Sequence, residues 1–234
     1  VRLSLAEAMA ALERAGSVQT MKTYLRHGAK EPLFGVSFAT LKGLLKRIGV
    51  DHDLAIALWD TGNFDARNLA VKIADPAIMK TSELDRWARG NTVSMCLGYV
   101  AALASEGPHG VSRANAWLSS RDVAKRATGW SLVGVLAMRD LTTLDPWFLA
   151  RLGEIERSIH TAPTAERSAM NQALISIGCR SAALRKAVTA AAKRIGPVEV
   201  DHGDTACKTP DAVAYISKTW AHSTSKGFES PAAH

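Results

Sequence analysis

The stretch "NFDARNLAVKIAD" (residues 63–75) decides the fold. Two later stretches share its layout, "RDVAKRATGWSLVGVLA" (121–137) and "TAERSAMNQALISIG" (164–178). Each opens with a helix-capping residue and an acid, places an arginine early, and continues as a helix of small apolar residues. Self-similarity at a spacing of roughly 40 to 60 residues is typical of stacked helix pairs. The sequence therefore predicts an all-α solenoid.

Residues that start and end helices recur along the rest of the chain. Ser4 with Glu7 has the spacing of a capping box. Ser37 opens a helix that Gly49 closes. Between such signals apolar residues return every three or four positions, and no run alternates with period two, so about a dozen short helices and no sheet are expected.

The pattern divides the chain into three segments. Helical repeats are expected over 1–196, because the repeating signals end at Gly196. A loop and a capping helix should follow over 197–222. The polar end of the chain, 223–234, is expected to be a flexible tail.

Composition and cysteine spacing limit the class of protein. Apolar residues make up 47% of the 234 residues and charged residues 22%, which is typical of a soluble globular protein. No apolar run approaches the roughly 18 residues of a membrane span, and no signal-peptide layout is present, so a cytoplasmic protein without membrane contact is expected. Cys96, Cys179 and Cys207 form no CxxC pair, so no metal site, cofactor or disulfide framework is predicted.

The charge balance favours a polyanionic partner. The formal net charge is +7 and the pI is near 9.5, which suits nucleic acid. Arg67, Arg126 and Arg167 stand in the first turns of the three repeated stretches, and in a solenoid they could line one face and contact phosphates. The alternative is that each arginine caps a neighbouring helix or pairs with the acid close to it in the sequence. The sequence leaves both readings open.

One block carries a family resemblance. "FGVSFATLKGLLKRIGVDHDLAIALWDTGNFDARNLAVKIADPAIM" (34–79), followed by "LDRWARG" (84–90), resembles the DNA alkylation repair family of HEAT-like repeat proteins, the AlkD-type DNA glycosylases. The likeness continues more weakly over most of 1–195. It implies a right-handed α-α superhelix, C-shaped, whose basic concave face holds double-stranded DNA, possibly alkylated. It also implies hydrolysis of the N-glycosidic bond of N3- or N7-alkylated purines, and we expect a monomer.

The family's catalytic pattern is not kept. Active members place an aromatic residue, and an aspartate one helical turn later, after the "RW" segment. Lined up through that segment, these places fall at about Val93 and Leu97, and a second family tryptophan falls at about Gln172, while Arg126 matches the family arginine. No acid occurs between Asn91 and Ala104 to stabilise a cationic sugar. The catalytic residues are therefore unknown, and alkylpurine glycosylase activity stays an open question.

Other side chains could extend a DNA-binding surface. Trp87 has charged neighbours on both sides, so it is expected at a surface where it could stack on a base or plug a helix end, whereas Trp59 and Trp130 are expected in the core. Lys186 and Lys193 belong to a basic stripe that is either a DNA track or a solvated helix face. The candidate DNA-binding residues are Arg67, Lys125, Arg126, Arg167, Lys186, Lys193 and Trp87.

The stretch "VEVDHGDTACKTPDA" (198–212) gathers acids, a histidine, a cysteine and a lysine. Their spacing matches no zinc site. The favoured interpretation is a helix entrance, with Thr209 as N-cap and Pro210 as the first helical residue. A further hypothesis is that the loop folds over the concave face, which would make Asp201 and Asp204 weak candidates for the missing catalytic carboxylate.

A function from another class competes with DNA binding. A helical-repeat scaffold could bind a protein partner, and its basic face would then be incidental. The salt dependence of duplex binding separates the two, because phosphate contacts release counterions and weaken steeply as ionic strength rises.

Overall fold

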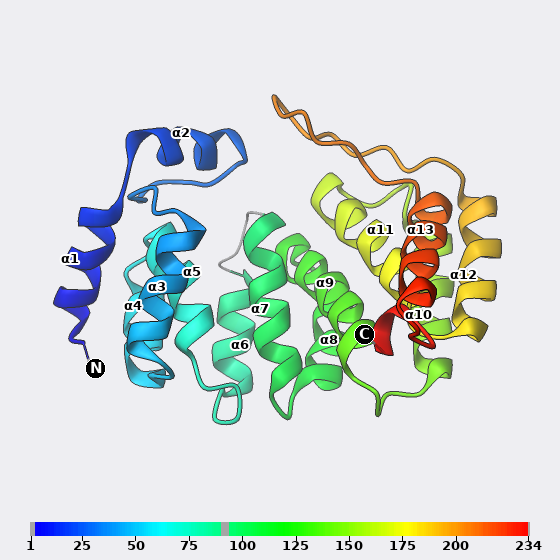
Figure 1. The fold of residues 1–234 in the computed structure, drawn as a ribbon, viewed down its shortest axis with the longest axis horizontal. Coiled ribbons are helices and arrows are strands. Elements are labelled where there is room, and N and C mark those ends of the chain that lie inside the picture. The colour runs from blue at the N-terminus through cyan, green and yellow to red at the C-terminus, as the bar shows by residue number, and fades with distance from the viewer. Residues whose placement is uncertain (1–2, 90–93, 234) are drawn as a thin grey trace. The chain divides into compact units, whose positions relative to one another are not determined.

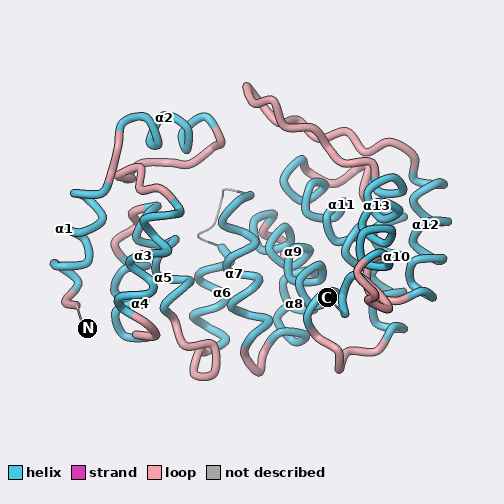
Figure 2. Tube along the Cα trace, in the orientation of Figure 1, coloured by secondary structure: helices cyan, strands magenta, loops and turns pink. Residues whose placement is uncertain are grey.

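The computed structural model describes residues 3–89 and 94–233, and for residues 94–97 it describes the helix without the side chains. Within these residues there is no β-strand, only an isolated bridge between Gly16 and Val36, which confirms the all-α prediction (Figures 1 and 2). The helices are α1 (Leu5–Ala15), α2 (Val18–Arg26), α3 (Phe38–Ile48), α4 (His52–Asp60), α5 (Phe64–Ile73), α6 (Thr81–Arg89), α7 (Ser94–Glu106), α8 (Gly110–Leu118), α9 (Val123–Arg139), α10 (Asp145–Ser158), α11 (Thr164–Gly178), α12 (Ala182–Ile195), α13 (Ala212–Ser225) and the 3-10 turn η1 (Pro231–Ala233).

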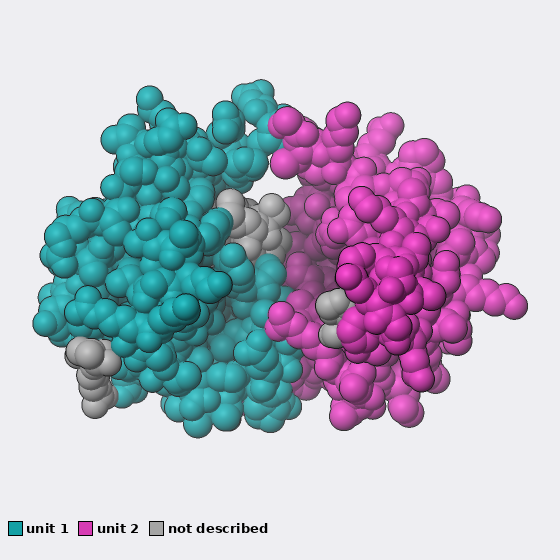
Figure 3. Space-filling model, in the orientation of Figure 1, with its two compact units in different colours: residues 1–108, 203–205 teal, residues 109–202, 206–234 magenta. Residues whose placement is uncertain are grey.

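The chain divides into two compact units (Figure 3). Unit 1 comprises residues 1–108 and 203–205, and it contains α1 to α7. Unit 2 comprises residues 109–202 and 206–234, and it contains α8 to α13 and η1. Within unit 2, α13 packs against α11 and α12. The helix expected to cap the repeats is therefore built onto the last of them.

Most helices begin and end at the capping residues predicted from the sequence. Both halves of the Ser4 and Glu7 capping box are formed. The N-cap of α13 differs from the prediction: it is Asp211, not Thr209, because the Asp211 carboxylate accepts the Ala214 N–H at 2.7 Å. The helix consequently begins two residues later than expected.

The end of the chain, which the sequence predicts to be a flexible tail over 223–234, makes contacts within unit 2. α13 continues to Ser225, and the residues after it fold back onto unit 2. Pro231 is buried, and the backbone N–H of Ala232 donates to the Cys179 carbonyl at 3.3 Å. These are contacts that the polar composition of the segment does not predict.

Unit 1 is organised around the buried carboxylate of Asp65 in α5. It accepts the backbone N–H groups of Phe34, Gly35 and Val36 at 2.6, 3.0 and 2.8 Å, so it fixes the turn that leads into α3. Gly35 has φ +76°, and a Cβ there would lie 2.5 Å from the Ser17 carbonyl oxygen. Only glycine fits this turn.

Unit 2 has its core between α9 and α11, the two longest helices of that unit. Leu132 and Leu136 of α9 are buried, as is Leu174 of α11. Gly134 lets the helices approach closely, since a Cβ there would lie 3.3 Å from Ser176 Oγ and 3.5 Å from Ala173 Cα. The small residues of the repeated stretches thus serve close helix packing.

Candidate nucleic-acid interface

The three arginines of the repeated stretches occupy equivalent positions. Arg67, Arg126 and Arg167 are each the fourth residue of their helices, α5, α9 and α11. Each side chain is half-buried. The contacts of their guanidinium groups decide between the two readings that the sequence left open.

Arg67 is directed at the helix that precedes its own. Its Nε donates to the Trp59 carbonyl in the last turn of α4 at 3.3 Å, and its guanidinium carbon lies 5.0 Å from the centre of the Trp59 ring. A cation at a helix C-terminus satisfies an orphan carbonyl and complements the helix dipole. The arginine therefore caps α4 in the way the second reading describes.

Arg126 makes the same contact in unit 2 and adds an ion pair. Its Nη1 donates to the Ser120 carbonyl, just beyond α8, at 2.9 Å. Its Nε donates to Glu166 of α11 at 2.9 Å, and Glu166 is buried. Lys125, beside it, is half-buried. Arg126 thus links α8, α9 and α11.

Arg167 repeats the capping contact a third time. Its Nη2 donates to the carbonyls of His160 and Ala162, just beyond α10, at 3.0 and 2.9 Å. Its Nη1 donates to the Glu199 carbonyl at 2.9 Å. These donors serve the backbone of the chain itself, so the arginine of each repeated stretch has a structural role.

The expectation that Trp87 lies at a surface is wrong. Its side chain is fully buried, and its ring stacks on that of Trp59 with the centroids 4.4 Å apart. The charged neighbours of Trp87 point elsewhere, as Arg86 shows by pairing with Asp60. Trp59 and Trp130 are core residues as expected, at 4% and 3% exposure.

The basic stripe of α12 consists of exposed cations, Arg185, Lys186, Lys193 and Arg194. Arg185 lies 4.8 Å from the centre of the Trp220 ring, and Arg194 pairs with Glu156 at 2.5 Å. Lys186 and Lys193 are exposed and stand seven residues apart, two helical turns along one face. Among the seven candidate DNA-binding residues, these two are the exposed ones.

The loop after α12 carries the weak catalytic candidates. Asp201 and Asp204 are exposed. His202 Nε2 lies 3.0 Å from Thr209 Oγ1, a bond within the loop. The described residues include no group of three or more histidine, cysteine or acidic side chains placed to hold a metal ion.

The buried cysteine is no nucleophile near neutral pH. Burial raises the pKa of the Cys179 thiol to about 11, although a hydrogen bond with Thr219 and the charge of Arg185 act in the opposite direction. Cys207, in contrast, is exposed.

The positions aligned with the family's catalytic residues are described only in part. Val93 lies outside the described residues, and so does the side chain of Leu97, whose backbone belongs to α7. Gln172 lies exposed on α11. The residue beside it, Asn171, is buried and is not among the site residues predicted from the sequence. The sequence feature that could have indicated Asn171 is a polar amide on the apolar face of a predicted helix.

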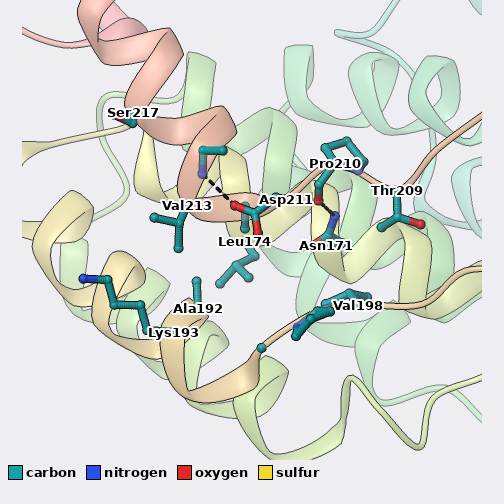
Figure 4. Close-up of a pocket in the computed structure, with 14 residues that line it drawn as sticks. Asn171, Leu174, Ala192, Lys193, Val198, Thr209, Pro210, Asp211, Val213 and Ser217 are labelled. Atoms are coloured by element: carbon teal, nitrogen blue, oxygen red, sulfur yellow. Dashed lines mark hydrogen bonds between the residues drawn. The ribbon is translucent and has the colours of Figure 1, made fainter.

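Asn171 lines a cavity of about 640 Å³ in unit 2 (Figure 4). Its Nδ2 donates to the Pro210 carbonyl at 3.0 Å, while its Oδ1 is buried and has no hydrogen-bond partner among the described residues. Lys193 of α12 also lines the cavity. The other lining residues are Leu174, Ala192, Gly196, Pro197, Val198, Thr209, Pro210, Asp211, Ala212, Val213, Ala214 and Ser217.

The fold places the chain in the class of HEAT-like helical-repeat proteins. One solved structure is described as "a new family of proteins related to the HEAT-like repeat DNA glycosylases with affinity for branched DNA structures". It is 32% identical, the match covers 96% of this chain and 95% of that one, and the TM-score is 0.85. The predicted HEAT-like architecture is confirmed.

The family follows from the sequence model described as DNA alkylation repair enzyme, which matches residues 5–216. The chain belongs to this family. Uncharacterized proteins of Listeria monocytogenes and Listeria innocua are each 26% identical to it, over 215 and 213 residues, which cover 88% of this chain and 93% of each relative. None of the described helices combines the length and apolar character that crossing a membrane requires.

Proposed function

We propose that the protein binds the duplex arms of DNA, prefers branched DNA to a plain duplex, and does not excise alkylated purines. One observation carries the proposal: a structure 32% identical over 96% of this chain belongs to proteins with affinity for branched DNA. The TM-score of 0.85 shows that the two folds are alike over that length. The net charge of +7 supports a polyanionic ligand.

The exposed lysines of α12 supply the phosphate contacts. Lys186 and Lys193 face solvent on one side of the helix, so each ammonium can approach a phosphate without leaving a protein partner. The arginines of the repeated stretches are different, because their donors cap the carbonyl ends of neighbouring helices. Substituting those arginines would test stability together with binding.

The absence of excision follows from the chemistry that the reaction requires. An alkylated purine leaves as a neutral base, and the demand on the protein is to stabilise the cationic sugar with a carboxylate. The sequence has no acid between Asn91 and Ala104, where the family's aspartate is aligned. Binding without chemistry is the function that this sequence supports.

The test compares a four-way junction with a linear duplex built from the same strand sequences. We expect the wild-type protein to bind the junction more tightly, and to lose affinity for both DNAs steeply as salt rises. Lys186→Glu should weaken binding and flatten the salt slope by about 1 in log–log terms. Fluorescence anisotropy at several salt concentrations measures both quantities.

Lys80→Glu is the matched control for the charge change. Lys80 is exposed in unit 1, and its substitution alters the net charge by the same amount as Lys186→Glu. The proposal fails if Lys80→Glu and Lys186→Glu weaken binding equally, or if affinity for both DNAs does not change with salt.

A scaffold that binds a protein is a second candidate, favoured by one surface of unit 1. An open cleft of about 440 Å³ is lined by Asp51, Asp53 and Asp75 together with Val50 and Ile78. Val50 and Ile78 are 68% and 58% exposed, a combination of acid and aliphatic side chains unsuited to phosphate. If Ile78→Asp abolished binding of a protein partner and Lys186→Glu left that binding intact, a scaffold function would replace DNA binding.

A further inference from the structure

We infer that the cavity between α11, α12 and the start of α13 receives one unpaired nucleobase of the bound DNA, an inference that rests on the proposed function. The cavity is about 640 Å³, within the usual range of ligand sites, and all its lining residues belong to unit 2. α11 contributes Asn171 and Leu174, α12 contributes Ala192 and Lys193, and the start of α13 closes the other side (Figure 4).

The Asn171 side chain is oriented for recognition. It is 1% exposed, and the bond from its Nδ2 to the Pro210 carbonyl fixes the amide plane. The Oδ1 atom remains buried without a partner in the described part of the chain. A buried carbonyl oxygen without a donor is costly, so the site favours a ligand that brings an N–H group.

The other lining residues define the shape and polarity of that ligand. Leu174, Ala192 and Val213 offer apolar walls suited to a flat ring. The Lys193 ammonium can meet an anionic group attached to the ring. An aromatic ring with N–H donors, joined to a phosphate, is a nucleotide.

One acid also lines the cavity. Asp211 is exposed, and its carboxylate accepts the Ala214 N–H at the N-terminus of α13. The helix dipole compensates its charge there, so the carboxylate repels a phosphate less than an isolated one would. Lys193 remains the cation that lines the same cavity.

The base must be unpaired to reach Asn171. Every DNA base carries an N–H donor on its pairing edge, and in a duplex that edge is occupied by the partner base. Proteins that read a single base hydrogen-bond this edge and hold the ring between apolar side chains. Bulges, and branch points that carry unpaired nucleotides, provide such bases, which connects the cavity with DNA that departs from a plain duplex.

The experiment uses a duplex that carries a single bulged 2-aminopurine and the same duplex with that base paired. We expect the wild-type full-length protein to bind the bulged duplex about tenfold more tightly, the usual effect of one buried polar contact. The fluorescence of 2-aminopurine should rise as the base leaves the stack. The readout is the ratio of the two affinities, measured by anisotropy at one salt concentration.

Two variants test the cavity in different ways. Asn171→Leu removes the acceptor at similar volume, and Val213→Phe fills the space from a half-buried position. Both should bring the affinity ratio close to one. Val18→Phe, at a position 66% exposed in α2, is the matched control and should keep the wild-type ratio.

The outcomes separate this inference from the proposed function. Equal wild-type affinity for both duplexes, or an unchanged ratio in both cavity variants, overturns the nucleobase site while DNA binding stands. Failure to bind any DNA overturns the proposed function. In that case, titration with deoxyadenosine monophosphate tests the nucleobase site by itself. The resonance of the Asn171 side-chain amide should shift in the wild type and should not shift in Val213→Phe. A wild-type resonance that does not shift overturns the inference.

Discussion

At the scale of single residues, Arg126 and Glu166 form the ion pair that joins α9 to α11. The Arg126 Nε and Glu166 Oε2 atoms are 2.9 Å apart, and Glu166 is 7% exposed. Removing the cation leaves a buried carboxylate without its partner. Substitution of Arg126 therefore affects the fold before it affects any ligand.

We predict that Arg126→Met lowers the free energy of unfolding by about 3 kcal/mol, the lower end for breaking a buried ion pair. Adding Glu166→Leu should restore a part of that loss, because the uncompensated charge is gone. Urea unfolding followed by circular dichroism measures both effects. Arg194→Met is the control, since its ion pair with Glu156 is on the surface.

Arg126→Met with no loss of stability would contradict this interpretation. It would return Arg126 to the list of side chains available to DNA. An equal loss of stability in Arg194→Met would also contradict it, because the effect would then not depend on burial of the ion pair.

At the scale of structural elements, the turn between α9 and α10 is held by two polar side chains. The Asp140 carboxylate accepts the hydroxyl and backbone N–H groups of Thr142 and Thr143. From the end of α11, Arg180 donates to the carbonyls of Asp140 and Thr143, both at 2.6 Å. The turn is thus held both by the Asp140 carboxylate within it and by the Arg180 guanidinium, which follows α11.

This turn should make stability depend on pH below 4. Burial alone would raise the pKa of Asp140, but the hydrogen bonds from Thr142 and Thr143 outweigh it and lower the pKa to about 2. A carboxyl whose pKa is lower in the folded state stabilises the fold above its ordinary pKa of 3.8 and loses that effect as pH falls through 2.

We therefore predict that Asp140→Asn is less stable than the wild type by at most about 2 kcal/mol at pH 6. The difference should shrink between pH 4 and pH 2, because the carboxyl of the unfolded chain becomes protonated below its ordinary pKa of 3.8, whereas the carboxyl of the folded chain stays ionised until the pH reaches about 2. Urea unfolding at pH 6, 4, 3 and 2 measures it. A difference that is constant over this range would show that Asp140 acts by shape and not by charge.

The sequence predicts the helices well because their signals are local. A cap such as Asn63 bonds residues two and three positions away, so its effect is visible in the sequence itself. The positions of Trp87 and Arg167 are set by partners in other helices, and flanking charges do not report such partners. The cavity at Asn171 escaped prediction for the same reason, since three helices and a loop form it.

At the scale of the whole molecule, membership of the DNA alkylation repair family raises the question of activity directly. We predict that incubation with methylated duplex DNA releases no 3-methyladenine or 7-methylguanine above the spontaneous rate. The reason is the absence of an acid over residues 91–104. Chromatography of the released bases measures this, with an active alkylpurine glycosylase as the positive control.

Release above the spontaneous rate would show that another carboxylate serves the reaction. Asp201 and Asp204, both exposed in the loop after α12, would then be the first to substitute. Loss of release in Asp201→Asn or Asp204→Asn would identify the acid.

The arginines that cap preceding helices have an evolutionary consequence. Because Arg67, Arg126 and Arg167 serve the backbone of their own chain, selection for a folded protein keeps them whatever becomes of the active site. A lineage can lose its chemistry and still carry the sequence pattern that marks its ancestry. In this chain the arginines of the repeated stretches therefore reflect how the helices are joined, and they carry no information about excision.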